Sequence, residues 1–254
     1  MTANEYNNND YEKRTNSRSS KGHCFKCGAE SGRLAMINHA ADERRDFGKD
    51  EECLILEITS DDAKGYWMIV EASMDAKLSD LDAFLRAAWM ECCHHLSMFC
   101  SRDDKPFRGN KYNLFLKISS FKKDHVFTYL YDFDNSSTAE VKITKKSKRE
   151  KRRGAIRLIA RNDPMYPHCE ICGADAAFVK RSDAGVTEYT AICKKCMRGR
   201  KDKKSYAPFA NSPRMGMCEF KGEFDDFNYA KGKEMPESEL MSEKRYKDWY
   251  AFEE

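Results

Sequence analysis

Residues 53–72 read CLILEITSDDAKGYWMIVEA and hold two apolar runs on either side of a polar segment. The CLILEI and YWMIVEA runs are rich in aliphatic and aromatic side chains, a composition typical of strands. Between the two runs, Asp61, Asp62 and Gly65 are residues that favour tight turns. The stretch therefore predicts a β-hairpin.

Apolar runs further along the chain predict the rest of a sheet. Each run is a few residues long and alternates apolar with polar side chains or is apolar throughout, as strands do. Joined to the hairpin, they predict a mostly antiparallel sheet. The runs are YNLFLKI at 112–118, VFTYLYDF at 126–133, AEVKI at 139–143 and AIRLIA at 155–160.

Residues 79–99 have the strongest helical pattern. Ser79 precedes Asp82 by three positions, which approximates a capping box. Apolar side chains then recur at three- and four-residue steps, so one helix face is predicted to be buried. A mostly antiparallel sheet packed by one main helix is an α+β fold of two layers. The apolar stripe consists of Leu81, Phe84, Leu85, Ala88, Trp89, Cys92 and Leu96.

A run of metal-binding residue types, Cys92, Cys93, His94 and His95, lies where this helix is predicted to end. We favour a structural interpretation over a metal site. Cys92 falls on the apolar stripe as a small core side chain, and adjacent histidines on a helix cannot face the same way.

The composition is that of a soluble globular chain with one large or two small domains. Its 254 residues are 41% hydrophobic and 34% charged, with a net charge of +3. The longest apolar run, 66–70, is far shorter than the roughly 20 residues that cross a bilayer. The first residues are polar and Asn/Ser-rich, so no secretory signal is predicted. We therefore expect a cytoplasmic protein in which the C-x-x-C cysteines, six of the eleven, serve metal binding rather than disulfides.

Two C-x-x-C pairs, Cys169/Cys172 and Cys193/Cys196, predict a zinc ribbon. The sequence between them reads as two short strands around a Gly-containing turn, and such a hairpin brings both pairs to one ion. Four thiolates fill a tetrahedral zinc site, so the predicted role of Zn2+ is structural. The alternatives are a redox dithiol and free cysteines.

A third C-x-x-C pair, Cys24 and Cys27, is followed by Gly28 and predicts an N-terminal knuckle. His39 is a candidate third ligand, and Cys53 is the nearest soft side chain for a fourth position. A second zinc site is one interpretation of these residues. An incomplete, metal-free knuckle is the other.

Two basic runs are candidates for nucleic-acid binding. Residues 145–153 and 194–204 each hold seven basic side chains and one acidic side chain. Such runs can contact phosphates and release counterions. The alternative is a solvated hairpin tip and an exposed linker. The candidate residues are Lys145, Lys146, Lys148, Arg149, Lys151, Arg152, Arg153, Lys194, Lys195, Arg198 and Arg200.

The last residues form an acidic, aromatic segment. Residues 219–254 contain eleven acidic and six basic side chains. Segments of this kind can fold onto a protein partner, and the alternative is that the tail packs on its own chain. The aromatic residues are Phe224, Phe227, Tyr229, Trp249, Tyr250 and Phe252.

These patterns divide the chain into five segments. No internal repeat is predicted, because the C-x-x-C pairs recur without any shared flanking sequence. The segments are a disordered polar tail (1–20), the N-terminal CxxC knuckle (21–48), the α+β core (49–160), the zinc ribbon with its basic run (161–204) and a C-terminal segment ending in the acidic tail (205–254).

The chain resembles the Ri-plasmid open-reading-frame-three-like family, also known as insertion-element passenger TnpR-type proteins. The matching stretches span roughly 66–218 and include LSDLDAFLRAAWMECCHHLSMF, TYLYDF, AIRLIARNDP, the C-terminal knuckles and NSPRMGMC. The resemblance implies a compact α+β core in which a helix ending near His95 packs by the strand carrying Asp132. It implies no reaction, and no recombinase arrangement of an activated serine or tyrosine with spaced arginines is present in the sequence.

The chain departs from this family's pattern at three places. Asp134 stands where the family has Gly after Tyr-Asp-Phe, and the loop 134–138 is one residue longer. His94 replaces a Gly-like position. The N-terminal knuckle lacks the cysteine that usually follows His39 by a few residues.

The favoured function is a zinc-binding accessory protein that contacts nucleic acid through its basic runs and is linked to a mobile element. One alternative is a protein–protein adaptor that uses the acidic tail. A less favoured alternative is a metal-dependent enzyme using His94, His95 and Asp132, since His and carboxylate can act as ligands, bases or acids. The sequence has no phosphate-binding glycine loop, no nucleophile elbow and no H-E-x-x-H motif.

Overall fold

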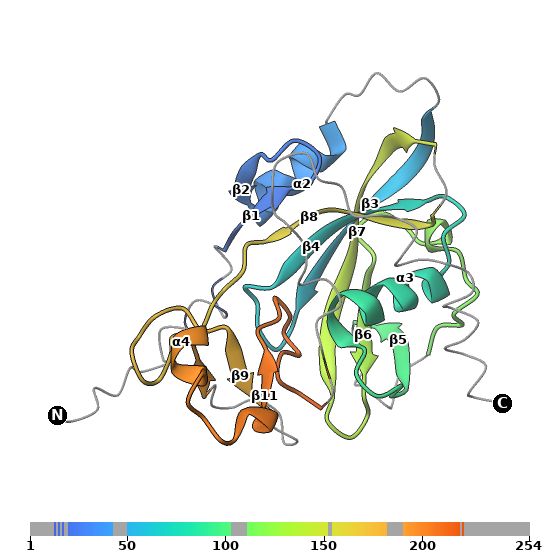
Figure 1. Cartoon of the computed structure of the whole chain (residues 1–254). Helices are drawn as coiled ribbons and strands as arrows, with labels where there is room; N and C mark the ends of the chain where they lie inside the picture. Colours follow the sequence, from blue (N-terminus) through green and yellow to red (C-terminus); the bar gives the residue numbers. More distant parts are fainter. Residues whose placement is uncertain are drawn as a thin grey trace.

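The computed structural model describes residues 13, 15, 17, 20–42, 50–102, 111–151, 154–181, 190–218 and 220. These residues form an α+β fold with an eight-stranded sheet of order β2-β1-β8-β4-β3-β7-β6-β5 and a three-stranded sheet of order β10-β9-β11 (Figure 1). All paired strands are antiparallel. The predicted acidic tail beyond 220 and most of the predicted disordered tail at 1–20 lie outside the described residues.

The strands of the large sheet are β1 (Lys21–Cys24), β2 (Glu30–Gly32), β3 (Asp50–Ser60), β4 (Trp67–Ser73), β5 (Ser97–Ser101), β6 (Val126–Tyr131), β7 (Ser137–Glu150) and β8 (Ile156–Asn162). The small sheet consists of β9 (Phe178–Lys180), β10 (Ala191–Ile192) and β11 (Tyr206–Pro208). The helices are α2 (Arg33–Asp42), α3 (Leu78–Leu85) and α4 (Lys194–Met197), with a π-helical turn at Arg86–Met90 and 3-10 turns at Ile118–Ser120 and Lys203–Ser205.

The predicted hairpin is confirmed as β3 and β4, which pair in register from Cys53 with Ser73 to Thr59 with Trp67. Alternate side chains of a strand point to opposite faces. Leu56 therefore joins the large core on one face, whereas Ile55 joins a smaller cluster on the other. Burial on both faces explains why these two strands are apolar almost throughout.

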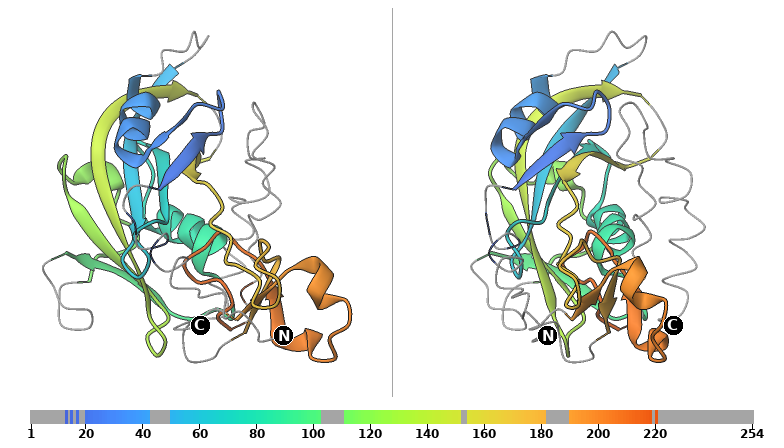
Figure 2. Two further views of the ribbon diagram at one scale, coloured as in Figure 1. Left: turned by 90° about the vertical axis from the view of Figure 1, so that its left-hand side faces the viewer. Right: turned by 60° about the vertical axis from the view of Figure 1, so that its left-hand side comes forward.

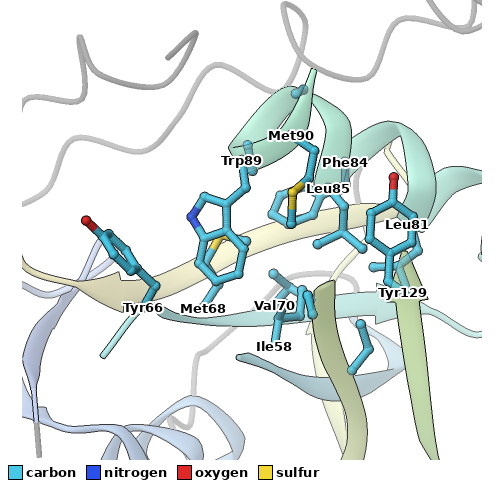
Figure 3. Packing of buried hydrophobic residues seen from close by; sticks show 14 of the residues in the cluster. Ile58, Tyr66, Met68, Val70, Leu81, Phe84, Leu85, Trp89, Met90 and Tyr129 are labelled. Atoms are coloured by element: carbon cyan, nitrogen blue, oxygen red, sulfur yellow. The ribbon is translucent and has the colours of Figure 1, made fainter. Parts of the chain in front are cut away.

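The predicted main helix covers the large-core face of the sheet. Figure 3 shows Phe84, Leu85 and Trp89 pointing from the helix toward Met68 and Val70 of β4, and all five side chains are buried. The helical pattern thus predicts the buried face correctly over residues 78–90.

The predicted continuation of this helix to residues 92–95, within a helical pattern running to 99, is wrong. The helix widens into a π-helical turn and ends at Met90, where the N–H of Glu91 donates to the carbonyl oxygen of Arg86 at 2.8 Å. The Glu91 carboxylate then accepts the N–H of His94, a local bond that competes with helix continuation. Residues 97–101 instead form β5, which pairs with β6.

The predicted strand at 112–118 is also wrong. The side chain of Asn113 accepts the N–H of Phe115 at 2.8 Å, and the N–H of Leu116 donates to the Asn113 carbonyl. An asparagine bonded in this way makes a turn. Phe115 is 70% exposed, so the apolar run does not reach the core at that position.

The opposite face of the sheet is covered by α2, a helix that the sequence patterns did not predict. Met36 and Ile37 of α2 pack with Trp67, Ile69 and Ile159 in the smaller buried cluster. The described part of the chain therefore has helices on both faces of its sheet rather than the predicted two layers. Figure 2 shows α2 near one end of the large sheet and the C-terminal module at the other. This module consists of β9, β10, α4 and β11.

The chain returns to the core after this C-terminal module. Asn211 and Asn162 exchange two hydrogen bonds of 3.0 Å, and the buried guanidinium of Arg161 donates to the carbonyl oxygen of Asn211. Met215 and Phe220 are buried in the large core. Among the described residues, no helix is both long enough and apolar enough to cross a membrane.

Replacing Gly22 by Ala should destabilise the protein. A Cβ at this position on β1 would collide with the backbone carbonyl of Arg161 and the ring of Trp67. Overpacking of this kind costs about 1–3 kcal/mol. Gly32→Ala on the paired strand is a matched control, since a Cβ there meets nothing within 4 Å. Thermal unfolding of both variants measures the difference, and equal melting temperatures would contradict the close packing at Gly22.

Candidate metal centres

The N-terminal knuckle and the first C-terminal knuckle have the same backbone geometry. In CFKCGA the N–H of Cys24 donates to the carbonyl of Ala29 at 2.9 Å, and the N–H of Gly28 donates to the carbonyl of Cys24 at 2.8 Å. In CEICGA at 169–174 the same two bonds are 2.7 and 2.8 Å long. Gly28 and Gly173 both have a φ of 73°, a region that favours glycine. The two knuckles therefore share a C-x-x-C-G-A motif, and the expectation of no common flanking sequence is corrected.

The four C-terminal cysteines lie together. The sulfur atoms of Cys169, Cys172, Cys193 and Cys196 are all within 4.8 Å of one another, because the pairing of β9 with β10 brings the two turns side by side. The Cys172–Cys193 and Cys172–Cys196 sulfur distances are 3.7 and 3.6 Å. Tetrahedral zinc with bonds of about 2.3 Å separates its sulfur ligands by about 3.8 Å. The donor set and spacing therefore fit a metal ion of this kind.

Local electrostatics favour the thiolate form of Cys193. The backbone N–H of Cys196, at the start of α4, donates to the Cys193 sulfur at 3.5 Å and is the main reason that the pKa of Cys193 falls to about 7. A thiolate is the form of cysteine that binds metal. The predicted turn at 182–185 and the first half of the predicted second strand, 186–189, lie outside the described residues.

The N-terminal group consists of Cys24, Cys27 and His39, whose ligand atoms are also within 4.8 Å of one another. His39 comes from α2, and its Nε2 atom is 3.2 Å from the Cys27 sulfur. Cys53, the candidate fourth ligand, is not part of this group. It is fully buried on β3 in the apolar cluster beneath α2, and burial raises its pKa to about 12. The described residues thus offer three ligands at this site.

Four of the seven basic residues of the first run lie within strand β7, and three of these four are engaged by other groups. Arg149 is buried and binds Glu51 at 2.6 Å, while Lys148 pairs with Asp50 at 2.8 Å. Lys145 donates to an amide side chain of α2 at 2.7 Å. The remaining members are Lys146 and Lys151, which are exposed, and Arg152 and Arg153, which lie outside the described residues.

The second basic run lies on the surface of the C-terminal module. Arg200 is held internally by Asp202, through bonds of 2.8 and 2.7 Å, and its guanidinium lies over the ring of Tyr206. The other basic side chains are exposed, and no ion pair joins them to another described residue. They are Lys194, Lys195, Arg198, Lys201, Lys203 and Lys204.

Of the three residues considered for an enzyme active site, only His95 and Asp132 lie close together. His95 Nδ1 lies 3.5 Å from the Asp132 carboxylate, as expected if the segment after the helix reaches this strand. His94 is exposed and faces Glu91 instead. Asp132 is buried and accepts a hydrogen bond from Arg214. Burial is the largest single influence and would raise the pKa of Asp132, but the hydrogen bonds from Arg214 and from the Asn135 N–H, together with the charge of Arg214, outweigh it and lower that pKa.

Sequence reasoning missed one group of ligand atoms. Cys92, Cys93, His95 and Cys218 also have their ligand atoms within 4.8 Å of one another. The three N-terminal members are adjacent in sequence, but nothing in the spacing points to Cys218, which follows them by more than a hundred residues. Cys92 is half-buried and packs against the large core as predicted, but Leu96 is 54% exposed, so the predicted apolar stripe does not continue beyond Cys92.

Comparisons with known proteins identify no family for this chain. No family model and no curated protein matches it. A crystal structure of a protein of unknown function from Methanosarcina mazei Go1 is similar over 44% of this chain and 69% of that one, with 18% sequence identity and a TM-score of 0.38.

Proposed function

We propose that the protein is a zinc-binding protein whose C-terminal module contacts nucleic acid. The observation that carries the proposal is the coincidence of a four-cysteine group with exposed basic side chains on the same small module. Lys194 and Lys195 lie between the cysteines of the second knuckle, so metal binding would fix the backbone that presents them.

The two basic runs are not equivalent in this proposal. Side chains already bound to carboxylates, such as Arg149 and Arg200, have less to gain from a phosphate. Exposed, unpaired lysines and arginines release counterions when they meet a polyanion, which is the main source of sequence-independent affinity. We therefore assign the principal contacts to Lys194, Lys195 and Arg198, with Lys146 and Lys151 as secondary contacts.

The link to a mobile element is part of the proposal and rests on the resemblance to the Ri-plasmid open-reading-frame-three-like family. The stretches that carry the resemblance include β6, β8 and the knuckles of the C-terminal module. Phosphate contacts from the basic side chains would give binding to DNA or RNA with little dependence on base sequence.

Replacing Lys194, Lys195 and Arg198 together by Gln should weaken binding to mixed-sequence DNA or RNA by about tenfold or more at low salt. The slope of log affinity against log salt should become shallower by about one for each phosphate-binding side chain that is replaced. Fluorescence anisotropy at several salt concentrations measures both effects.

A matched control removes the same charge from the end of β7 and the residue that follows it, through Gln at Lys146, Lys148 and Lys151. Its expected loss is smaller, because Lys148 is already paired with Asp50. Equal losses in both triple variants would contradict the assignment to the C-terminal module. Wild-type binding that is weak at low salt, or independent of salt, would remove the nucleic-acid proposal altogether.

A further inference from the structure

Three segments that are distant in sequence meet at one edge of the large core. They are the loop 91–96 after the helix, the end of β6 at Asp132, and the segment 211–218 that follows the C-terminal module. The backbone N–H of Asp132 donates to the carbonyl of Leu96 at 2.9 Å, which fixes the loop against the strand. The metal-binding side chains of Cys92, Cys93, His95 and Cys218 gather here.

We propose that these four residues form a further zinc site, separate from the two C-x-x-C centres. Three thiols and one imidazole are a donor set that zinc uses in structural sites. All four ligand atoms lie within 4.8 Å of one another, and the Cys218 sulfur is 3.9 Å from Nε2 of His95. Sulfur and nitrogen ligands of tetrahedral zinc are separated by about 3.5 Å. Small side-chain movements are therefore enough to close the site on an ion.

The groups around the cluster orient the imidazole for this role. The Asp132 carboxylate lies 3.5 Å from Nδ1 of His95, leaving Nε2 free to face the cysteines. Metal-binding histidines usually donate their second ring N–H to a carboxylate or carbonyl, which fixes the ring and raises its basicity. Arg214 is fully buried and holds Asp132 in place from the other side.

Arg214 also offsets the charge of the thiolates. Its Nη2 atom is 3.5 Å from the Cys92 sulfur and 3.8 Å from the Cys218 sulfur. Three thiolates around Zn2+ carry a net negative charge, and a guanidinium N–H directed at two of them stabilises that charge. Arg214 thus connects the ligands to the carboxylate that positions His95.

Backbone strain is concentrated at the same place. Among the described residues, four non-glycine residues have positive φ, and three of them belong to this cluster or its immediate support. They are His94 at 60°, Asp132 at 64° and Cys218 at 46°. Such conformations cost free energy and persist where the surrounding structure requires them, often at functional sites. Here they turn His95, the Asp132 carboxylate and the Cys218 thiol toward one another.

A metal ion at this position would join the loop 91–96 to the last described part of the chain. With four protein ligands the site is closed, so its role is structural rather than catalytic. It would hold the segment 211–218 on the core and thereby fix the base of the C-terminal module. This role is independent of nucleic-acid contact.

Metal analysis of the full-length protein tests the proposal. Cys93→Ser is the informative variant, because Cys93 is exposed and its replacement does not disturb the core. We expect the zinc content to fall by about one equivalent per chain in Cys93→Ser and in Cys218→Ser. Cys100→Ser is the control: Cys100 is buried on β5 and belongs to none of the three groups, so the metal content should not change.

A second readout separates this site from the other two. In protein loaded with cobalt(II), each thiolate contributes a sulfur-to-cobalt absorption band, and this band should decrease in Cys93→Ser while nucleic-acid affinity stays at the wild-type value. Unchanged zinc and cobalt signals in both variants would overturn the proposal. A disulfide between two of these cysteines in the purified protein would also overturn it.

Discussion

Cys172→Ser should remove one equivalent of zinc and unfold the C-terminal module while leaving the eight-stranded sheet intact. The module's strands are three, two and three residues long, and its own buried cluster is small. Zinc binding at such structural sites contributes on the order of 10 kcal/mol to folding. Loss of one thiolate from a four-thiolate site would therefore remove a large part of what orders this segment, and only the packing of Val179, Ala191 and Ala207 on the large core would remain.

Limited proteolysis measures this effect directly, since the module is rich in lysine and arginine. Cleavage within 163–210 should become fast in Cys172→Ser and in wild-type protein treated with a strong chelator. Cys100→Ser should keep both its zinc and its resistance. A chelated protein that retained full resistance and an unchanged melting temperature would show that packing alone holds the module together.

Asp82→Ala should be among the most destabilising single substitutions in the core. The fully buried carboxylate of Asp82 accepts hydrogen bonds from Arg86 at 3.0 Å, Ser97 at 2.6 Å and Tyr129 at 2.7 Å. Without this carboxylate the Ser97 and Tyr129 hydroxyls lose their buried acceptor, and Arg86 keeps its ion pair with Glu91 at 2.9 Å. Removing one partner of such a buried network costs about 3–5 kcal/mol. For a protein of this size the melting temperature should fall by about 6–20 °C.

The neighbouring Asp80→Ala variant is the control. Asp80 lies on the same helix and caps it by accepting the N–H of Lys77 at 2.8 Å, so its loss should cost only about 0.5–2 kcal/mol. Thermal or urea unfolding of both variants gives the comparison. If Asp82→Ala proved no worse than Asp80→Ala, the hydrogen bonds at Asp82 would not be a principal support of the helix.

The parts of the fold predicted correctly are those in which local pattern and tertiary contact agree. The two runs at 53–58 and 66–72 are apolar almost throughout because both faces of β3 and β4 are buried. The helix pattern also gives the right buried face up to Met90. Beyond that point the apolar spacing continues, but bonds of Glu91 to Arg86 and His94 end the helix.

The predictions fail where one polar side chain forms a turn, or where a residue on a distant strand neutralises the charge of a basic side chain. Asn113 turns an apolar run that alternation would have made a strand. Arg149 looks like part of a free basic run in the sequence, yet the pairing of β7 with β3 places it against Glu51. Neither contact can be inferred from the spacing of residues along the chain.

The candidate metal sites also divide into one that local sequence spacing predicts and one that depends on contacts between distant segments. The spacing of Cys169, Cys172, Cys193 and Cys196 predicts their group because all four ligands lie on a short hairpin unit. The group containing Cys218 depends on the return of the chain to the core after the C-terminal module. Sequence spacing alone could not have joined Cys218 to the helix end.

The mutual bonds of Asn162 and Asn211 mean that the C-terminal module is attached at two adjacent points rather than through a single flexible tether. A module that is attached at both of its ends cannot rotate freely relative to the sheet. A polyanion bound by Lys194 and Lys195 would accordingly have a fixed orientation relative to the large sheet. A force on the bound polyanion would be transmitted to the end of β8.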